Sequence, residues 1–239
     1  MTSDANQAAR SLPPISQRIY LALRKAIIRC EISPGTMVDA GAIAREYDVS
    51  RTPVRDAMQR LAADGLVAIQ SRSGYRVAPI TFQGVHELLD LRAAIGPHIA
   101  RQAARYARPE DIAQLRSIVD EYKSPLDVGA MQQVARRFHV TIAQCSRNQR
   151  LVTLSETLFD ELERLVRFAI DFSVKAGEHS DEHTLLVDAI EAGDGDRAAA
   201  IEAAHISSSR DFLIERLMTL GYLSENPVPG RLPGGQVGR

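Results

Sequence analysis

Apolar residues near the start of the chain recur with the period of an amphipathic helix. Ile19, Leu23 and Ile27 share one face of a first predicted helix, which ends near the Ser-Pro-Gly sequence at residues 33–35. The same period predicts a second, short helix at about residues 40–47. After a polar lead, the chain therefore begins with helical structure.

A third helix and two strands are predicted next. Ser50 is a suitable N-cap and Pro53 falls in the first turn, which together predict a helix over about residues 51–63. The period then changes to alternation, and this change predicts short strands at residues 66–69 and 75–77. Helix, turn, helix and hairpin in this order are typical of a winged helix-turn-helix.

Beyond Pro79 the pattern predicts helices only. They are expected at about residues 82–106, 109–122, 128–145, 148–175, 179–192 and 195–218. The expected fold is mostly α, with an N-terminal winged helix-turn-helix domain and a C-terminal all-helical bundle of about six helices. The expected divisions are a flexible lead (1–14), the winged domain (15–80), the helical domain (81–222) and a disordered tail (223–239).

The overall composition is that of an ordinary globular protein, but charge divides the chain. Of its 239 residues, 45% are hydrophobic and 25% are charged, which argues against disorder. Residues 1–80 hold 11 basic and 7 acidic side chains, and residues 81–239 hold 18 and 23, so the net charge of −1 combines balances of +4 and −5. Two cysteines, no signal peptide and no bilayer-spanning apolar run predict a cytoplasmic protein without membrane contacts.

The free face of the third predicted helix carries groups that suit DNA. Arg51, Thr52 and Arg55 lie opposite its apolar face, and Arg72 and Arg76 flank the turn of the predicted hairpin. Arginine binds guanine edges and phosphate oxygens, and helix N-termini attract phosphates. The basic part of the chain is thus a candidate for binding double-stranded DNA, although a solvated helix face that happens to hold arginines has the same periodicity.

Three segments carry a resemblance to a known family: EISPG (31–35), IAREYDVSRTPVRDAMQRLAADGLV (43–67) and SGYRV (73–77). Through them, residues 28–77 resemble the DNA-binding domain of the GntR family of bacterial transcription regulators. The resemblance implies operator contacts from Arg51, Thr52 and Arg55, and a wing tip at Ser73-Gly74. It also implies homodimers, because two winged domains bind a pseudo-palindromic operator. One family position that is sometimes a DNA-contacting arginine is Gly41 here.

Three of the six histidines lie on the apolar faces of separate predicted helices. His139 is at the edge of a stripe that contains Phe138, His183 shares its face with Val187, and His205 lies four residues after Ile201. Imidazoles that converge in a helical bundle can bind a divalent metal such as zinc or nickel. Three unrelated core histidines, each with its own hydrogen-bond partner, give the same pattern.

Three segments of the helical part carry a second resemblance: LRAAIGPHIARQAA (91–104), RRFHVTIAQCSRNQRL (136–151) and EHTLLVDAIEAGDGDRAAAIEAAHI (182–206). Through them, residues 82–218 resemble the FCD ligand-sensing domain of the FadR branch of the GntR family, and six helices rather than seven point to its VanR-like division. In metal-containing members one Asp and three His bind the ion, and the matching histidines are His139, His183 and His205. The Asp position is Ala135. Water or an effector carboxylate is then expected to complete the coordination of a zinc or nickel ion.

Arg92 shares a predicted helix face with Leu88 and Ile95, where a permanent charge is costly unless an anion meets it. The resemblance implies a pocket for small organic acids. Arg92 is therefore expected to bind an effector carboxylate, with Arg164 and Arg167 as further candidates. A structural ion pair with a nearby Asp or Glu is the alternative for Arg92.

The sequence therefore predicts a homodimeric transcription regulator, a repressor rather than an enzyme, whose operator affinity is controlled by a small carboxylate metabolite. A metal-dependent hydrolase is one alternative, because His179 to His183 match the H-x-x-E-H pattern of a metalloprotease class. A DNA-binding protein without an effector is another. The identity of the metabolite, the operator sequence, the identity of the metal and the choice between repressor and activator cannot be read from the chain.

Overall fold

The structure, a computed structural model, describes residues 13–70, 74–122, 126–169 and 180–219. The mostly α fold is confirmed, since these residues form nine helices and three short strands. The chain divides into two compact units between Pro79 and Ile80. Most of the expected lead and all of the expected tail lie outside the described residues. Within the described residues, no helix combines the length and the apolar character that a membrane span needs.

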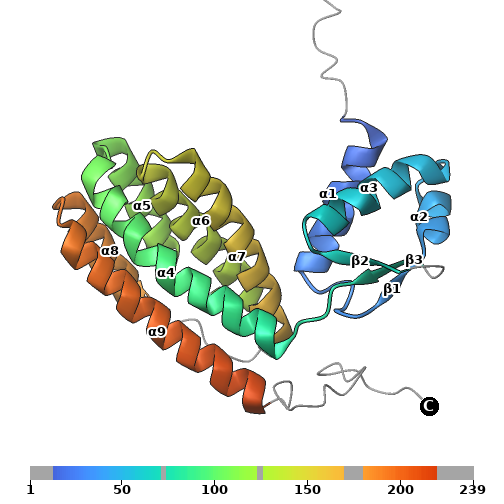
Figure 1. The fold of residues 1–239 in the computed structure, drawn as a ribbon. Helices are drawn as coiled ribbons and strands as arrows, with labels where there is room; N and C mark the ends of the chain where they lie inside the picture. The colour runs from blue at the N-terminus through green and yellow to red at the C-terminus, as the bar shows by residue number, and fades with distance from the viewer. Residues whose placement is uncertain (1–12, 71–73, 123–125, 170–179, 220–239) are drawn as a thin grey trace, which may run out of the picture. The chain divides into compact units, whose positions relative to one another are not determined.

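The first unit is a three-helix domain with a small sheet (Figure 1). Its elements are α1 (Ile15–Ile28), β1 (Met37–Val38), α2 (Ala40–Glu46), α3 (Arg51–Ala63), β2 (Val67–Gln70) and β3 (Gly74–Val77). The sheet is antiparallel in the order β1-β3-β2, with Met37 opposite Arg76 and Val67 opposite Val77. Helices and sheet share one core, which includes Ile19, Ile27, Val54, Met58, Leu61 and Val77.

The start of α2 and the course of α3 follow from local chemistry. The Asp39 carboxylate accepts a hydrogen bond from the Gly41 amide at 2.7 Å and so caps α2. The helix α3 spans the predicted residues, and its buried face is the predicted one, comprising Val54, Ala57, Met58 and Leu61. Gly65, with a φ of +72°, follows the helix in the left-handed conformation that favours glycine.

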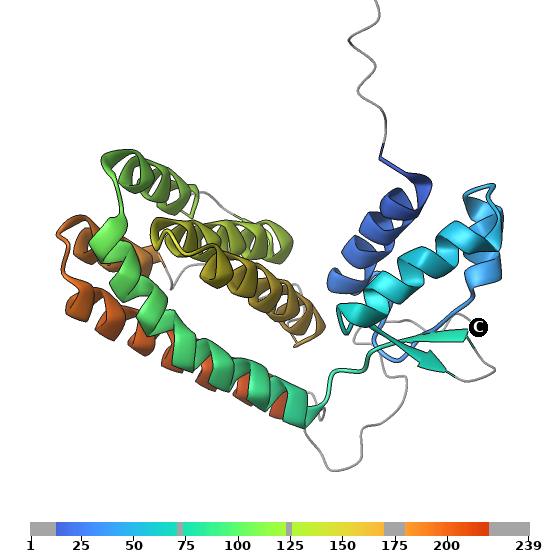
Figure 2. The same cartoon turned by 45° about the horizontal axis from the view of Figure 1, so that its top comes forward.

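The second unit contains six helices in its described part. They are α4 (Phe82–Tyr106), α5 (Pro109–Glu121), α6 (Val128–Cys145), α7 (Gln149–Ala169), α8 (Ser180–Glu191) and α9 (Gly195–Thr219). The bounds agree closely with the predicted ones, and residues 170–175 and 179 of the predicted helices lie outside the described residues. Figures 1 and 2 both show α4 and α9 side by side along most of their length.

Two glycines bring α4 and α9 into close contact. A Cβ atom on Gly96 would lie 2.5 Å from Cδ1 of Ile206, and one on Gly195 would lie 3.3 Å from the backbone oxygen of Arg101. Because both distances are shorter than ordinary van der Waals contact, a side chain at either position requires the facing atoms of the other helix to move. The pair α4 and α9 accordingly forms the most extensive helix contact of the unit.

Two apolar clusters stabilise this bundle. One gathers around Phe138 and Leu115 and joins parts of α4, α5, α6 and α8. The other gathers around Leu89 and Leu162 and joins the first half of α4 to α7 and to the end of α9. Charged and imidazole side chains are also buried in this unit: Arg92, His139, Asp160, Glu163, Arg164, His183, Glu202 and His205. Buried charge of this kind is costly unless it is compensated, so these residues mark candidate sites.

Candidate functional site

The exposed face of α3 presents three polar side chains near its N-terminus. Arg51, Thr52 and Arg55 are all exposed, and the buried face of the helix lies on the other side. The Arg51 guanidinium comes 3.7 Å from the point where a Cβ atom on Gly41 would lie, which places it beside the capped start of α2. Two guanidinium groups and a hydroxyl at a helix N-terminus suit phosphates and base edges.

The hairpin contributes a second basic group. The exposed guanidinium of Arg76 donates a hydrogen bond to the backbone oxygen of Gly35 at 3.0 Å, which ties β3 to the loop before β1. Gly74 begins β3 with a φ of +95°. The predicted contacts Arg72 and Ser73 lie outside the described residues. Of the hairpin residues predicted to contact DNA, the structure therefore describes Gly74 and Arg76.

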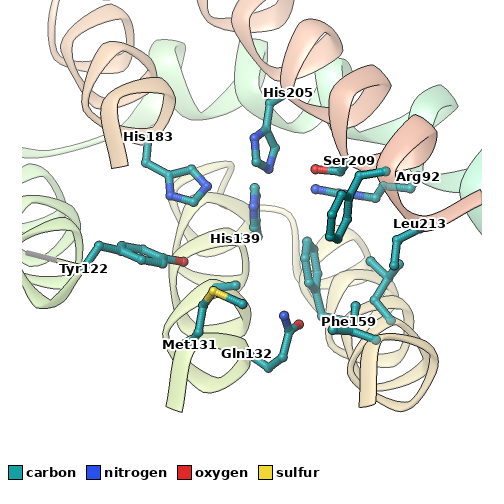
Figure 3. A pocket seen from close by; sticks show the side chains of 14 residues that line it. Arg92, Tyr122, Met131, Gln132, His139, Phe159, His183, His205, Ser209 and Leu213 are labelled. Carbon is teal, nitrogen blue, oxygen red and sulfur yellow. The ribbon is translucent and has the colours of Figure 1, made fainter. Parts of the chain in front are cut away.

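The three predicted histidines come together inside the second unit. His139 of α6, His183 of α8 and His205 of α9 are all buried, and one ligand nitrogen from each lies within 4.8 Å of the others. Their ring centroids are 4.9–5.4 Å apart, and Figure 3 shows the three rings facing a common point. Three buried imidazoles so close together are a donor set that zinc and nickel accept.

Two carboxylates lie beside the Nδ1 atoms of two of these histidines. Nδ1 of His205 donates a hydrogen bond to Oε2 of Glu182 at 2.7 Å. Nδ1 of His139 lies 3.5 Å from Oε1 of Glu202, and both of these side chains are buried. Burial raises the pKa of Glu202 to about 7; Arg92 opposes this shift and Glu182 adds to it. The histidine cluster therefore has carboxyl groups beside two of its three members.

A cavity of about 110 Å³ opens beside these rings. It is lined by Arg92, Tyr122, Met131, Gln132, Ala135, His139, Phe159, Leu162, Val166, His183, His205, Ser209, Phe212 and Leu213. In Figure 3, Arg92 and Ser209 lie on one side of the histidines and Tyr122 lies on the other. Since an apolar cavity of about 150 Å³ holds benzene, this space suits a small organic molecule.

Two polar groups in the cavity wall lack partners among the described residues. Nε of Arg92 and the hydroxyl of Tyr122 are buried without a hydrogen bond there. Burial lowers the pKa of Arg92, an effect that Glu202 opposes, and burial raises the pKa of Tyr122. The guanidinium carbon of Arg92 lies 5.6 Å from the Phe159 ring centroid, a cation-π contact. The cavity thus offers a cation and a hydroxyl to a small anion.

Comparison with known proteins identifies both units. Residues 15–77 match the model of the bacterial regulatory proteins of the gntR family, and residues 87–208 match the model of the FCD domain. The chain belongs to the GntR family of bacterial regulatory proteins. It is a DNA-binding transcription regulator with an FCD effector-binding domain.

Individual GntR regulators match most of the chain. The HTH-type transcriptional repressor RspR of Escherichia coli (strain K12) is 26% identical over 196 residues, 81% of this chain and 86% of that protein. The HTH-type transcriptional regulator LutR of Bacillus subtilis (strain 168) is 28% identical over 218 residues, 82% of this chain and 97% of that protein. The structure of E. coli McbR/YncC superposes with a TM-score of 0.70 at 18% identity, covering 86% of this chain and 99% of that one, so it shares the fold.

Of the four positions expected to bind a metal in this GntR chain, three are histidines and the expected acidic one is Ala135. Ala135 lines the cavity, so the side chain at the expected Asp position does face the site, and its methyl group supplies neither an oxygen nor a charge. The three histidine nitrogens still form a buried donor set, with carboxyl groups beside His139 and His205. Carboxylates behind metal-binding histidines are the usual second partners of such rings. The residues present therefore fit a divalent ion with an open coordination position.

Of the three predicted effector-binding arginines, only Arg92 lines the cavity in the described structure. On α7, the lining side chains are Phe159, Leu162 and Val166, which share one helical face. Arg164 is two residues from either of the last two and points elsewhere on the helix. Nε of Arg167 instead donates a hydrogen bond to Oε1 of Glu163 at 2.9 Å. The geometry of α7 therefore does not fit Arg164 and Arg167 as effector contacts.

The hydrolase alternative depends on a histidine pair that the structure does not describe in full. His179 lies outside the described residues, whereas His183 belongs to the histidine cluster.

Two residues of the site, Glu202 and Tyr122, were not predicted from the sequence. The only hint of Glu202 was its place one turn before His205, and Tyr122 lay at the end of a predicted helix.

Proposed function

We propose that this GntR regulator is a cytoplasmic, homodimeric repressor that binds a small carboxylate in the histidine cavity and has no enzymatic activity. The observation that carries the proposal is the buried guanidinium of Arg92, whose Nε has no hydrogen-bond partner among the described residues and which lines the cavity beside three histidines. A permanent cation in such a place is strongly stabilised by an anion. A carboxylate is a small organic group that is fully ionised at neutral pH and supplies such an anion.

A divalent metal, zinc or nickel, is part of the proposal. His139, His183 and His205 would hold it, and the space beside Ala135 leaves room for an oxygen of the effector. When bound, the ion would attract an anionic oxygen as a Lewis acid. The chain's own groups do the rest: Arg92 binds the carboxylate, and Phe159 and Leu162 exclude water from one side of the cavity.

Effector control of DNA binding requires a coupling between the two units. A ligand changes operator affinity only if it binds better to one arrangement of the winged domains than to another. In a homodimer, the two winged domains read the two halves of a pseudo-palindromic operator, so their spacing decides whether both fit. The relative named RspR is a repressor, which supports the same role for this chain.

We expect small monocarboxylates, and not their amides, to raise the melting temperature. The test is a thermal-shift series of acetate, propanoate, lactate, pyruvate and benzoate, each paired with its uncharged amide. A ligand at a hundred times its Kd adds about 2.7 kcal/mol to stability. Replacing Arg92 by Lys or Ala is expected to weaken the affinity for the acid by roughly 30-fold or more, because truncating a buried charge partner costs about 2 kcal/mol or more.

Arg101→Ala is the matched control for this series, since Arg101 is on the same helix, is exposed and pairs with Asp196. It is expected to leave the acid response unchanged. The acid that raises the melting temperature most is then added to the complex of the protein with promoter DNA. A repressor is expected to dissociate from the DNA. If no acid raises the melting temperature more than its amide does, the carboxylate site is absent. If the acid strengthens binding to promoter DNA, the protein is not a repressor that its effector releases.

We also expect the purified protein to retain up to one equivalent of zinc or nickel per chain. Elemental analysis after purification with supplemented metal is the measurement. Replacing any one of His139, His183 and His205 by Ala should remove most of the metal, because each supplies a third of the protein ligands. His98→Ala, at an exposed position on α4, should change nothing. Wild-type protein without metal would rule out the metal part of the proposal.

A further inference from the structure

Glu202 is a buried carboxylate that the family resemblance does not explain. Its side chain is 6% exposed, and it lies on α9 one turn before His205. Oε1 is 3.5 Å from Nδ1 of His139, while Oε2 has no hydrogen-bond partner among the described residues. Burying a carboxylate is expensive unless other groups compensate its charge, and Arg92 does so only in part, since burial still raises the pKa of Glu202 to about 7.

The contact of Glu202 with His139 repeats one made by a second carboxylate. Glu182 of α8 accepts a hydrogen bond from Nδ1 of His205, and Glu202 of α9 faces the same ring atom of His139. A proton held on Nδ1 leaves the lone pair of the imidazole on Nε2, which is the atom then available to a metal. In two of the three histidines Nδ1 thus faces a carboxylate, at 2.7 Å in His205 and at 3.5 Å in His139.

The fold makes room for Glu202 at the close contact of α4 and α9. A Cβ atom on Gly96 would lie 3.3 Å from Oε1 and 3.4 Å from Cγ of Glu202, so the missing side chain leaves space for the carboxylate. Ala135 of α6 faces the histidine cavity from another side and carries no charge. Negative charge near the cluster therefore comes from α8 and α9, and not from position 135.

We propose that Glu202 is a positioning residue of the metal site: it accepts the Nδ1–H hydrogen bond of His139, directs Nε2 toward His183 and His205, and supplies from α9 the negative charge that position 135 lacks. This inference rests on the metal site of the proposed function. Glu202 acts through His139 and does not bind the ion, since the potential ligand group among the described residues consists of the three histidines.

The first test is the affinity for Zn²⁺, measured by competition with a chromogenic chelator. Glu202→Gln keeps the size of the side chain and one acceptor oxygen but removes the charge. We expect it to weaken Zn²⁺ binding by roughly 10- to 100-fold, the usual effect of losing such a partner. Glu182→Gln is expected to act similarly at His205. The control is Glu191→Gln, which changes an exposed carboxylate paired with Arg116. Equal affinity for wild type and Glu202→Gln overturns the proposal.

A double-mutant cycle separates positioning from a general effect of charge. In a His139→Ala background, Glu202 has no ring to orient, so Glu202→Gln should change the remaining Zn²⁺ affinity by less than about twofold. If the loss is as large there as in the wild type, Glu202 acts on the ion from a distance, and the positioning role is wrong. Melting temperatures of all four proteins establish that each one folds.

The tautomer of His139 tests the inference even without metal. In the metal-free protein, ¹⁵N chemical shifts should place the proton of His139 on Nδ1 in the wild type and distribute it between both nitrogens in Glu202→Gln. A wild-type proton on Nε2 overturns the proposal. If wild-type protein binds no Zn²⁺ but shows the expected tautomers, the metal part of the proposed function fails while the contact between Glu202 and His139 is retained.

Discussion

Replacing Phe138 by Ala is expected to lower the free energy of unfolding by about 3–5 kcal/mol. Phe138 is fully buried and is the largest such side chain in the described structure. Its ring centroid lies 4.4 Å from that of His183 and 5.2 Å from that of His139. Truncation therefore opens a cavity in the core and removes the ring on which two histidines rest. A domain of this size then melts at a temperature lower by roughly 6–20 °C.

Scanning calorimetry of the whole chain measures this change in stability, and two further variants serve as controls. Phe138→Leu keeps most of the buried volume and should lose about a third as much stability. Tyr106→Ala removes an aromatic ring that is 43% exposed, and surface changes of that kind stay within about 0.5 kcal/mol. If Phe138→Ala has the same melting temperature as the wild type, the packing described for this core is wrong.

The second large effect is expected at the DNA-binding face. Arg51→Ala and Arg55→Ala should each weaken binding to the operator by about 1–3 kcal/mol, the value of one good arginine contact to a base edge. Both side chains are exposed near the N-terminus of α3, and their removal leaves the buried face of the helix intact. Fluorescence anisotropy with fragments of the promoters that neighbour the gene measures the loss, and random DNA of equal length measures specificity.

Salt dependence then separates the two kinds of contact. Removing an arginine that contacts a base weakens binding to the operator more than binding to random DNA. Removing one that contacts a phosphate weakens both equally and lowers the slope of log affinity against log salt concentration by about one. Arg108→Ala removes the same charge from an exposed position in the second unit, where Arg108 pairs with Glu110. If Arg51→Ala and Arg55→Ala bind DNA as well as this control does, neither residue contacts the operator.

The elements of the fold were predictable wherever local signals agreed. Ser50, Pro53 and a strict apolar face defined α3 to the residue. The strand β1 was missed because two residues, Met37 and Val38, are too short to show alternation, and they are a strand only through pairing with β3. Helix periodicity likewise predicted that the three site histidines would be buried, since each sits on an apolar face of its own helix.

The chemistry around the histidines was less accessible to sequence reasoning. A glutamate in a helix reads as a surface residue, and Glu202 is buried only because Gly96, more than a hundred residues earlier, leaves space for it. Arg164 and Arg167 do not line the cavity in the part of the chain that the structure describes. Their position on a long helix suggested the cavity, but the angular spacing from Leu162 and Val166 points these side chains elsewhere. The contact between distant helices decides the burial of Glu202, whereas rotation about the axis of α7 decides the direction of the two arginines.

The close contact of α4 and α9 also limits how the cavity can adapt to a ligand. Arg92 stands on α4, while His205 and Ser209 stand on α9, so one wall is built on two helices that are locked together at Gly96 and Gly195. Helices that interlock at glycines cannot slide along each other without collision, and parting them would expose packed apolar surface to water. For the proposed effector, the cavity therefore has one fixed wall and one adjustable wall, and selectivity for ligand shape depends on the adjustable wall, which α6, α7 and Tyr122, just after α5, provide.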